Sequence, residues 1–274
     1  MAFSVNTNIG AMAALQSLSV TQKDMATTQS RINTGLNVNS TKDDSAAYTI
    51  AQTLRGDVGG LKAVSSSLNR AKSTVDVAVA GAEQISDLLN QMKSKATEAA
   101  DAGLDDDSRT QVVADLTSLK STIDSVIKST DFNGTNLLDS TGSGSVAALT
   151  THKDLTATLA VSNQGFDTIV AGLDTSTITN ATTAGTFKGL VDTAFDSVKS
   201  ALSTLGSASR KIDAQLSFNS KLSDAIDGGI GNLVDADLAK ESANLQALQV
   251  KQQLGVQALS IANQAPQSIM SLFR

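Results

Sequence analysis

The strongest constraint on this chain is an uninterrupted heptad repeat over residues 61–99. Only 41% of the chain is hydrophobic, so an apolar residue at every core position is improbable by chance. Such heptads are typical of coiled coils, and the sequence predicts one helix about 58 Å long at 1.5 Å per residue. The same frame extends backwards to a start just after Asp43. The twelve a and d positions are Leu61, Val64, Leu68, Ala71, Val75, Ala78, Ala82, Ile85, Leu89, Met92, Ala96 and Ala99.

Two further helical patterns follow the first. Three aspartates and a serine over residues 105–108 are typical of a helix start, where carboxylates meet the positive end of the helix dipole. Apolar residues then recur at Val112, Leu116, Leu119, Ile123 and Val126. The last pattern has a positions at Val191, Val198, Leu205, Ile212, Asn219 and Ile226, among which only Asn219 is polar; a polar residue there can fix the register. The predicted fold is mainly α, a long antiparallel coiled coil or helical bundle.

Residues 131–188 have a different texture. They contain Asn133-Gly134, a Ser/Thr/Gly run over residues 140–145, and an alternation of Thr with apolar residues over 156–161. Asn-Gly favours tight turns and alternation favours half-buried strands. The sequence therefore predicts short β-hairpins and exposed loops in this central stretch.

Both ends of the chain are predicted to be helical, with an apolar residue recurring every seven positions. Glycines separate these helices from the central ones: Gly35 on one side, and Gly228, Gly229 and Gly231, predicted to form a hinge, on the other. The terminal helices are expected to pair with each other and still expose apolar residues, which calls for partner molecules. The predicted interface comprises Ile9, Met12, Leu15, Leu18, Met25, Ile32, Leu238, Leu245, Leu248, Leu254, Leu259, Ile261, Ile269, Leu272 and Phe273.

The composition leaves little room for catalysis or cofactors. The chain has no cysteine and one histidine, His152, which is expected to be a solvent-exposed loop residue. The net charge is −6 and no basic stripe exists to neutralise phosphates, which argues against nucleic acid. No stretch is apolar enough to span a membrane, and no secretory signal peptide begins the chain. The expectation is a protein that is not an enzyme and holds no metal or cofactor.

Several separated motifs resemble those of bacterial flagellin. Near the start these are residues 6–8 (NTN) and 31–46 (RINTGLNVNSTKDDSA), and residues 132–138 (FNGTNLL) are similar to an internal turn of the family. Near the end, residues 235–241 (DADLAKE) and 262–274, which begin ANQAPQ and finish LFR, are similar to the C-terminal signature. The resemblance covers about residues 1–138 and 187–274.

This resemblance implies a subunit of the flagellar filament used for swimming. It implies three segments: a terminal coiled-coil domain (1–42 and 233–274) in the filament core, a helical rod domain (43–138 and 187–232), and a short surface-exposed insert (139–186). It further implies a homopolymer of many copies, which other flagellins can join, and hook-associated and cap proteins as partners. Export through the flagellar type III apparatus with a chaperone would place the chain outside the cell without a cleaved signal peptide.

Two points stay open at the level of sequence. Flagellins are often O-glycosylated, and the insert offers Ser143, Ser145, Thr175 and Thr177 as candidate acceptors. The alternatives to a filament subunit are a hook–filament junction protein, which shares the end architecture, and a signalling coiled coil. A signalling coiled coil would not need the Gly/Thr-rich insert or the excess apolar surface of the terminal helices.

Overall fold

The computed structural model describes residues 7–141 and 144–272 of the chain, with side chains up to residue 264. The mainly α prediction is confirmed. The elements in chain order are α1 (Ile9–Thr34), α2 (Ser45–Ala99), α3 (Asp106–Ser129), β1 (Ser145–Leu149), β2 (Thr158–Ser162), α4 (Phe166–Ala171), the 3-10 helix η1 (Thr175–Thr177), α5 (Ala181–Val234) and α6 (Leu238–Leu272).

The chain divides into two compact units. The terminal unit consists of residues 1–56 and 225–274, and the central unit of residues 57–224. Helices α2 and α5 each contribute to both units, because the divisions fall inside them.

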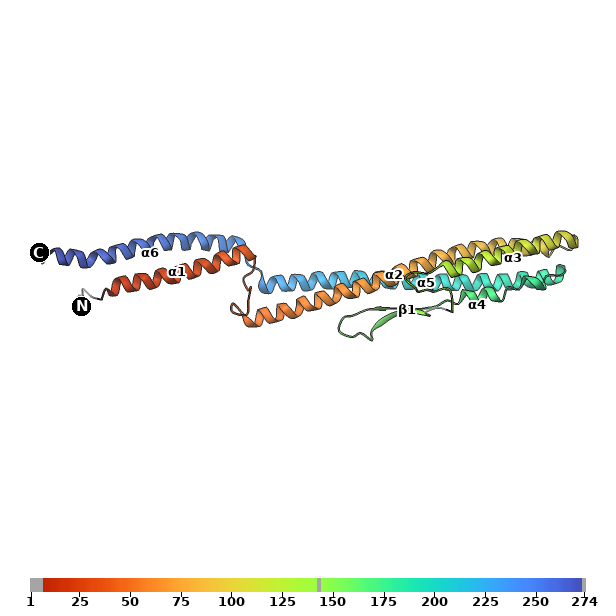
Figure 1. Cartoon of the computed structure of the whole chain (residues 1–274), viewed down its shortest axis with the longest axis horizontal. Helices are drawn as coiled ribbons and strands as arrows, with labels where there is room; N and C mark the ends of the chain where they lie inside the picture. Colours follow the sequence, from red (N-terminus) through yellow and green to blue (C-terminus); the bar gives the residue numbers. More distant parts are fainter. Residues whose placement is uncertain (1–6, 142–143, 273–274) are drawn as a thin grey trace. The chain divides into compact units, whose positions relative to one another are not determined.

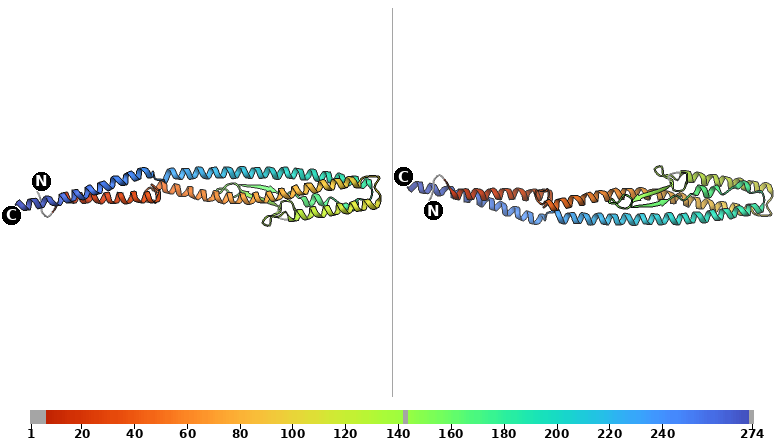
Figure 2. Two further views of the ribbon diagram at one scale, coloured as in Figure 1. Left: turned by 90° about the horizontal axis from the view of Figure 1, so that it is seen from above. Right: turned by 90° about the horizontal axis from the view of Figure 1, so that it is seen from below.

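In the terminal unit, α1 and α6 lie side by side and run antiparallel (Figures 1 and 2). At one end of the pair, Asn8 Nδ2 donates to the carbonyl oxygen of Ala262 over 2.7 Å. At the other end, Arg31 Nη1 lies 3.4 Å from Glu241 Oε1. The predicted pairing of the first and last helices is confirmed.

The connection from α1 to α2 is fixed by caps and by contacts with the end of α5. Gly35 closes α1 in the left-handed region at φ 73°, a conformation that costs glycine little. The N–H groups of Asn37 and Val38 both donate to the carbonyl oxygen of Val234. Asp44 Oδ1 then accepts from the N–H groups of residues 46 and 47, so α2 begins just after Asp43, as predicted.

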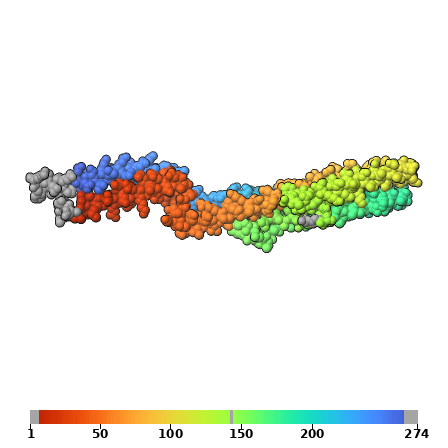
Figure 3. Space-filling view, viewed as in Figure 1, coloured from red at the N-terminus to blue at the C-terminus, as the bar shows by residue number. Residues whose placement is uncertain are grey.

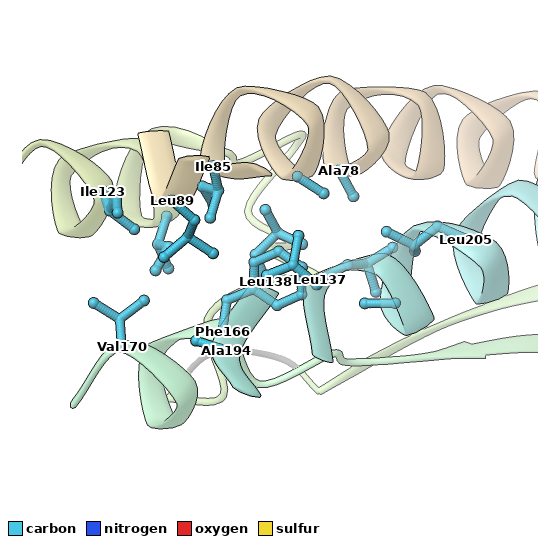
Figure 4. Close-up of a cluster of buried hydrophobic side chains, with 14 of the residues drawn as sticks. Ala78, Ile85, Leu89, Ile123, Leu137, Leu138, Phe166, Val170, Ala194 and Leu205 are labelled. Carbon is cyan, nitrogen blue, oxygen red and sulfur yellow. The ribbon is translucent and has the colours of Figure 1, made fainter. Parts of the chain in front are cut away.

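The central unit is built on α2, α3 and α5 (Figures 1 and 2). All twelve predicted heptad positions of α2 are buried, each with 3% or less of its surface exposed. All of them except Leu61 belong to one hydrophobic cluster with buried residues that α3 and α5 present at helical spacing, including Ile123 and Leu205 (Figure 4). Ion pairs join α2 to α5 in antiparallel order, Lys72 with Asp213 at 2.9 Å and Lys93 with Asp192.

Asn219 occupies its predicted core position with its polarity satisfied. The residue is 2% exposed, and its Nδ2 donates to the carbonyl oxygen of Leu61 at 2.8 Å and to Ser65 Oγ at 2.6 Å. A buried amide needs such partners, and this one sets the register of α5 on α2.

The insert contributes one hairpin in its described part. Strands β1 and β2 pair antiparallel with Ser145 opposite Ser162 and Leu149 opposite Thr158. The predicted Asn-Gly turn is present, with φ 53° at Asn133 and 78° at Gly134. The hairpin prediction is thus confirmed, whereas α4 and η1 were not predicted.

Two predictions about the connections are wrong. Helix α5 continues through Gly228, Gly229 and Gly231 to Val234, so the break lies at residues 235–237 and not at the glycines. His152 lies in a loop, as predicted, but its side chain is mostly covered: 18% of it is accessible, and Nε2 lies 2.9 Å from Asp57 Oδ1. The reason is Gly60, because a Cβ there would lie 2.7 Å from His152 Cβ. The glycine leaves the ring room against α2.

Candidate functional site

The predicted interface residues lie on the paired helices α1 and α6 of the terminal unit. They fall into two groups, those between the two helices and those on the outer faces of the pair. Residues three and four positions apart share a helix face, so each helix offers one stripe to its partner and leaves others outside. Of the predicted residues, those half-buried between the two helices are Leu18, Met25, Ile32, Leu245, Leu248 and Leu259. These six residues hold the two helices of one chain together.

The contact between the inner faces of α1 and α6 includes a polar pair at one end and a close approach of a glycine to a leucine. Gly255 of α6 faces Leu18, and a Cβ on the glycine would lie 3.3 Å from Leu18 Cδ1. Glu241 is 8% exposed and accepts from Arg31, which also lies in the last turn of α1, where a cation is favoured. This pair and the Asn8 contact fix the relative register of α1 and α6.

The outer apolar face of α1 consists of Ile9, Met12, Leu15 and Val20. Their exposed fractions are 77, 63, 59 and 54%. With the small and polar residues between them, they line a shallow open depression along the helix. Val20 was not among the predicted interface residues, although its position four residues after Gln16 places it on this face.

The outer apolar face of α6 consists of Val250, Leu254 and Ile261, each between 54 and 68% exposed. Val256 is also 54% exposed, but it lies about 120° around the helix from Val250. Leu238, at the start of the helix, is 50% exposed. Val256 was missed by sequence analysis because it falls outside both heptad stripes. The side chains of the predicted interface residues Ile269, Leu272 and Phe273 lie outside the described part of the chain. Large apolar residues concentrated in this way on a helix pair mark a surface that other molecules cover. Figure 3 shows one face of this surface, with α1 in red and α6 in blue.

The loop before α2 is ordered by a carboxylate. Asp43 Oδ2 accepts hydrogen bonds from the hydroxyl and N–H of Ser40 and from the N–H of Asn39. The hydrogen bonds from Ser40 are the main cause that holds the pKa of Asp43 below its usual value. The charged form therefore fixes the backbone between the two helices.

The glycosylation candidates have different surroundings. Thr175 is buried, and its Oγ1 shares a hydrogen bond of 2.9 Å with Thr117 Oγ1, so the expectation that it is an exposed acceptor is wrong. Ser145 and Thr177 are exposed, at the start of β1 and the end of η1. Ser143 lies outside the described residues.

Within residues 7–141 and 144–272 there is no group of three or more His, Cys, Asp or Glu side chains that could hold a metal ion. No helix in those ranges combines the length and hydrophobicity needed to cross a membrane. The predicted acidic cap is confirmed, since Asp105 Oδ2 accepts from the N–H of Ser108 at the start of α3.

Comparisons with known proteins agree with this architecture. The family profile for the bacterial flagellin N-terminal helical region matches residues 5–143, and the profile for the C-terminal helical region matches residues 189–273. The chain is 44% identical to the flagellins FljK and FljM of Caulobacter vibrioides, with 99% of this chain and 98% of each relative aligned. A Vibrio parahaemolyticus structure solved as a flagellar hook-associated protein shares the fold, with TM-score 0.56, 16% identity and 70% and 100% of the two chains covered. The chain therefore belongs to the bacterial flagellin family.

Proposed function

We infer that this chain is a structural subunit of the bacterial flagellar filament. The observation that supports this function is the pair of outer apolar faces on α1 and α6. Seven large apolar residues on these faces, and Val256 beside them, are more than half exposed, although the two helices already pair with each other. Burying apolar surface is worth about 25 cal/mol per Å², so a polymer in which neighbours cover both faces gains stability. The hook–filament junction and signalling alternatives gain no support from the family match.

The proposed filament divides the chain into a core, a rod and an outward-facing insert. Residues 1–42 and 233–274 form the filament core, with Ile9, Met12 and Leu15 of one copy and Leu254 and Ile261 of another among the contacts. Residues 43–138 and 187–232 form the rod around the core, and the insert 139–186 faces outward. Only 48 residues long by this division, the insert makes the filament slim.

The partners follow from the polymer. Many copies of this chain form the filament, and FljK and FljM, two flagellins from one organism at equal identity, support mixed filaments of several flagellins. At the filament ends the partners are hook-associated and cap proteins. The type III export apparatus and a chaperone deliver the chain to the cell exterior without a cleaved signal peptide. The chain has no catalytic role.

The test compares two substitutions on neighbouring residues of α6. Leu254→Asp places a charge on the outer apolar face, and Gln253→Asp places the same charge on an adjacent exposed polar position. Purified chains are seeded with fragments of wild-type filaments and examined by electron microscopy and sedimentation. Because a carboxylate is costly to bury, Leu254→Asp should raise the critical concentration at least about tenfold.

The control Gln253→Asp should polymerise as the wild type does. Circular dichroism should show the same helix content for all three chains, because the changed residue is exposed in each. Equal polymerisation of the two variants would contradict the assigned interface. A wild type that stays soluble with seeds present would contradict the filament function itself.

A further inference from the structure

A basic groove runs along one face of α2 in the central unit. It is lined by Lys62, Ser66, Asn69, Arg70, Ser73 and Phe132, and all but Phe132 lie on α2 at helical spacing. Lys62, Ser66, Asn69 and Arg70 are exposed. Throughout the part of the chain that the structure describes, no carboxylate forms an ion pair with Lys62 or Arg70. The carboxylate next to Phe132, that of Asp131, accepts instead from the N–H of Gly134.

An acidic turn joins α2 to α3 at the far end of the same unit. It presents Asp101, Asp105, Asp106 and Asp107, all exposed. Hydrogen bonds from Ser108 hold the pKa of Asp105 below its usual value, so its carboxylate is charged at neutral pH. None of the four forms an ion pair within the described residues.

The cation closest to this turn in the sequence is turned inward. Arg109 is 6% exposed, and its guanidinium donates to the carbonyl oxygens of Ala99, Asp101 and Leu104. Its donors thus satisfy the end of α2, where several helix carbonyls lack partners inside the helix. Asp101 and Asp105 each accept one backbone N–H, from Gly103 and Ser108, and no cation within the described residues neutralises the charge of the turn.

The groove and the turn cannot meet within one chain. Arg70 and Ala99 are 29 residues apart on the single helix α2, a separation of about 44 Å at 1.5 Å per residue. Figure 1 shows α2 running without a break towards the α2–α3 turn. Two complementary patches at different places on one rigid unit fit a head-to-tail contact between copies. Such a heterologous contact, repeated from copy to copy, generates an open polymer.

We propose that the basic groove of one copy binds the acidic turn of a second copy, displaced along the axis of α2. This contact rests on the filament function proposed above and adds a second, polar interface to the apolar one of α1 and α6. Charge complementarity of this kind favours the correct stagger and speeds encounter more than it adds affinity. A wrong stagger separates the opposite charges and loses this attraction.

The first test uses the absence of cysteine from the chain. Asn69→Cys and Asp106→Cys are introduced together, and filaments are oxidised with a copper catalyst and air. A disulfide needs Cα atoms within about 7 Å, so the two thiols of one chain cannot reach each other. The expected product on a non-reducing gel is a ladder of dimers, trimers and longer chains. The control, Lys211→Cys with Asp106→Cys, has the same number of thiols, also on exposed residues, and should give no ladder.

The second test reverses charges. Lys62→Glu with Arg70→Glu should raise the critical concentration about tenfold or more, as should Asp106→Lys with Asp107→Lys, because like charges then face each other. All four changes in one chain restore complementarity and should bring the value back to within about threefold of the wild type. The matched control, Lys211→Glu with Lys221→Glu, changes the charge equally on α5 and should leave it within the same range.

The outcomes separate this contact from the filament function. A wild type that forms no filaments overturns the proposed function. If filaments form but give no ladder of cross-linked chains, the groove contact is wrong while the filament function stands. The same holds if the chain with all four charges reversed does not recover assembly.

Discussion

The two units of this chain use the same helical pattern with opposite results. In the central unit, every heptad position of α2 is buried, since α2 has neighbours in α3, α5 and the insert. In the terminal unit, Thr28 is the only buried residue of α1, and its heptad residues Leu18, Met25 and Ile32 are only partly buried. A helix with one neighbour can bury only one stripe, whereas a helix among several can bury its whole apolar face. In the filament proposed above, other copies supply the missing neighbours of the terminal unit.

The largest expected effect tests whether the stability of the isolated chain resides in the central unit. Leu89→Ala truncates a side chain that is 0% exposed and belongs to the cluster in Figure 4. Such truncations cost about 2–5 kcal/mol, because transfer and cavity terms add. Denaturant unfolding of the monomer, followed by circular dichroism, measures the loss.

The matched change in the terminal unit is Leu254→Ala, at a residue 58% exposed. Its effect on monomer unfolding should stay within about 0.5 kcal/mol, since no cavity forms at an exposed position. Its effect on filament assembly should be much larger. Equal destabilisation of the monomer by the two substitutions would break the distinction between the units.

A smaller loss of unfolding free energy is expected when a methyl group is added to a glycine that lies in close contact with its neighbours in the central unit. A Cβ on Gly81 would lie 2.5 Å from Thr130 Oγ1 and 3.2 Å from Leu138 Cδ1. Gly81→Ala should cost about 1–3 kcal/mol of unfolding free energy, because the added methyl overpacks a buried site. The same measurement on Gly189→Ala, where a Cβ meets nothing within 4 Å, should show a gain of up to about 1 kcal/mol from helix propensity. A gain in unfolding free energy at both positions would contradict this, because it would show that the side chains around Thr130 move aside at little cost.

Sequence reasoning reached the long helices because their periodicity is strong and their interactions are local. The seam of α2, the cap at Asp105 and the pairing of the terminal helices all followed from spacing and side-chain type. It failed at His152 and at the glycines of α5, where the outcome depends on contacts between distant residues. The absence of a Cβ at Gly60 matters only once the hairpin lies on α2, and no local pattern reveals that. Burial of Thr175 depends likewise on its partner Thr117, 58 residues away.

The smallest effect concerns how the hairpin is held on α2. Asp57 accepts from His152 and lies 3.2 Å from Lys153 Nζ, and the hydrogen bond from His152 is the main cause that lowers the pKa of Asp57 below its model-peptide value of 3.8. A carboxyl whose pKa is lower in the folded state contributes stability that is fully present above the unfolded value. That contribution is lost as the pH falls below 3.8 and through the folded value. The unfolding midpoint of Asp57→Asn should therefore depend less steeply on pH between pH 5 and 2 than that of the wild type. The control is Asp87→Asn, at an acidic position without an ion pair in the described residues, which should keep the wild-type slope. An unchanged slope in Asp57→Asn would mean that the hairpin is held by its backbone and apolar contacts alone, such as the N–H of Leu149 on Ser67 Oγ.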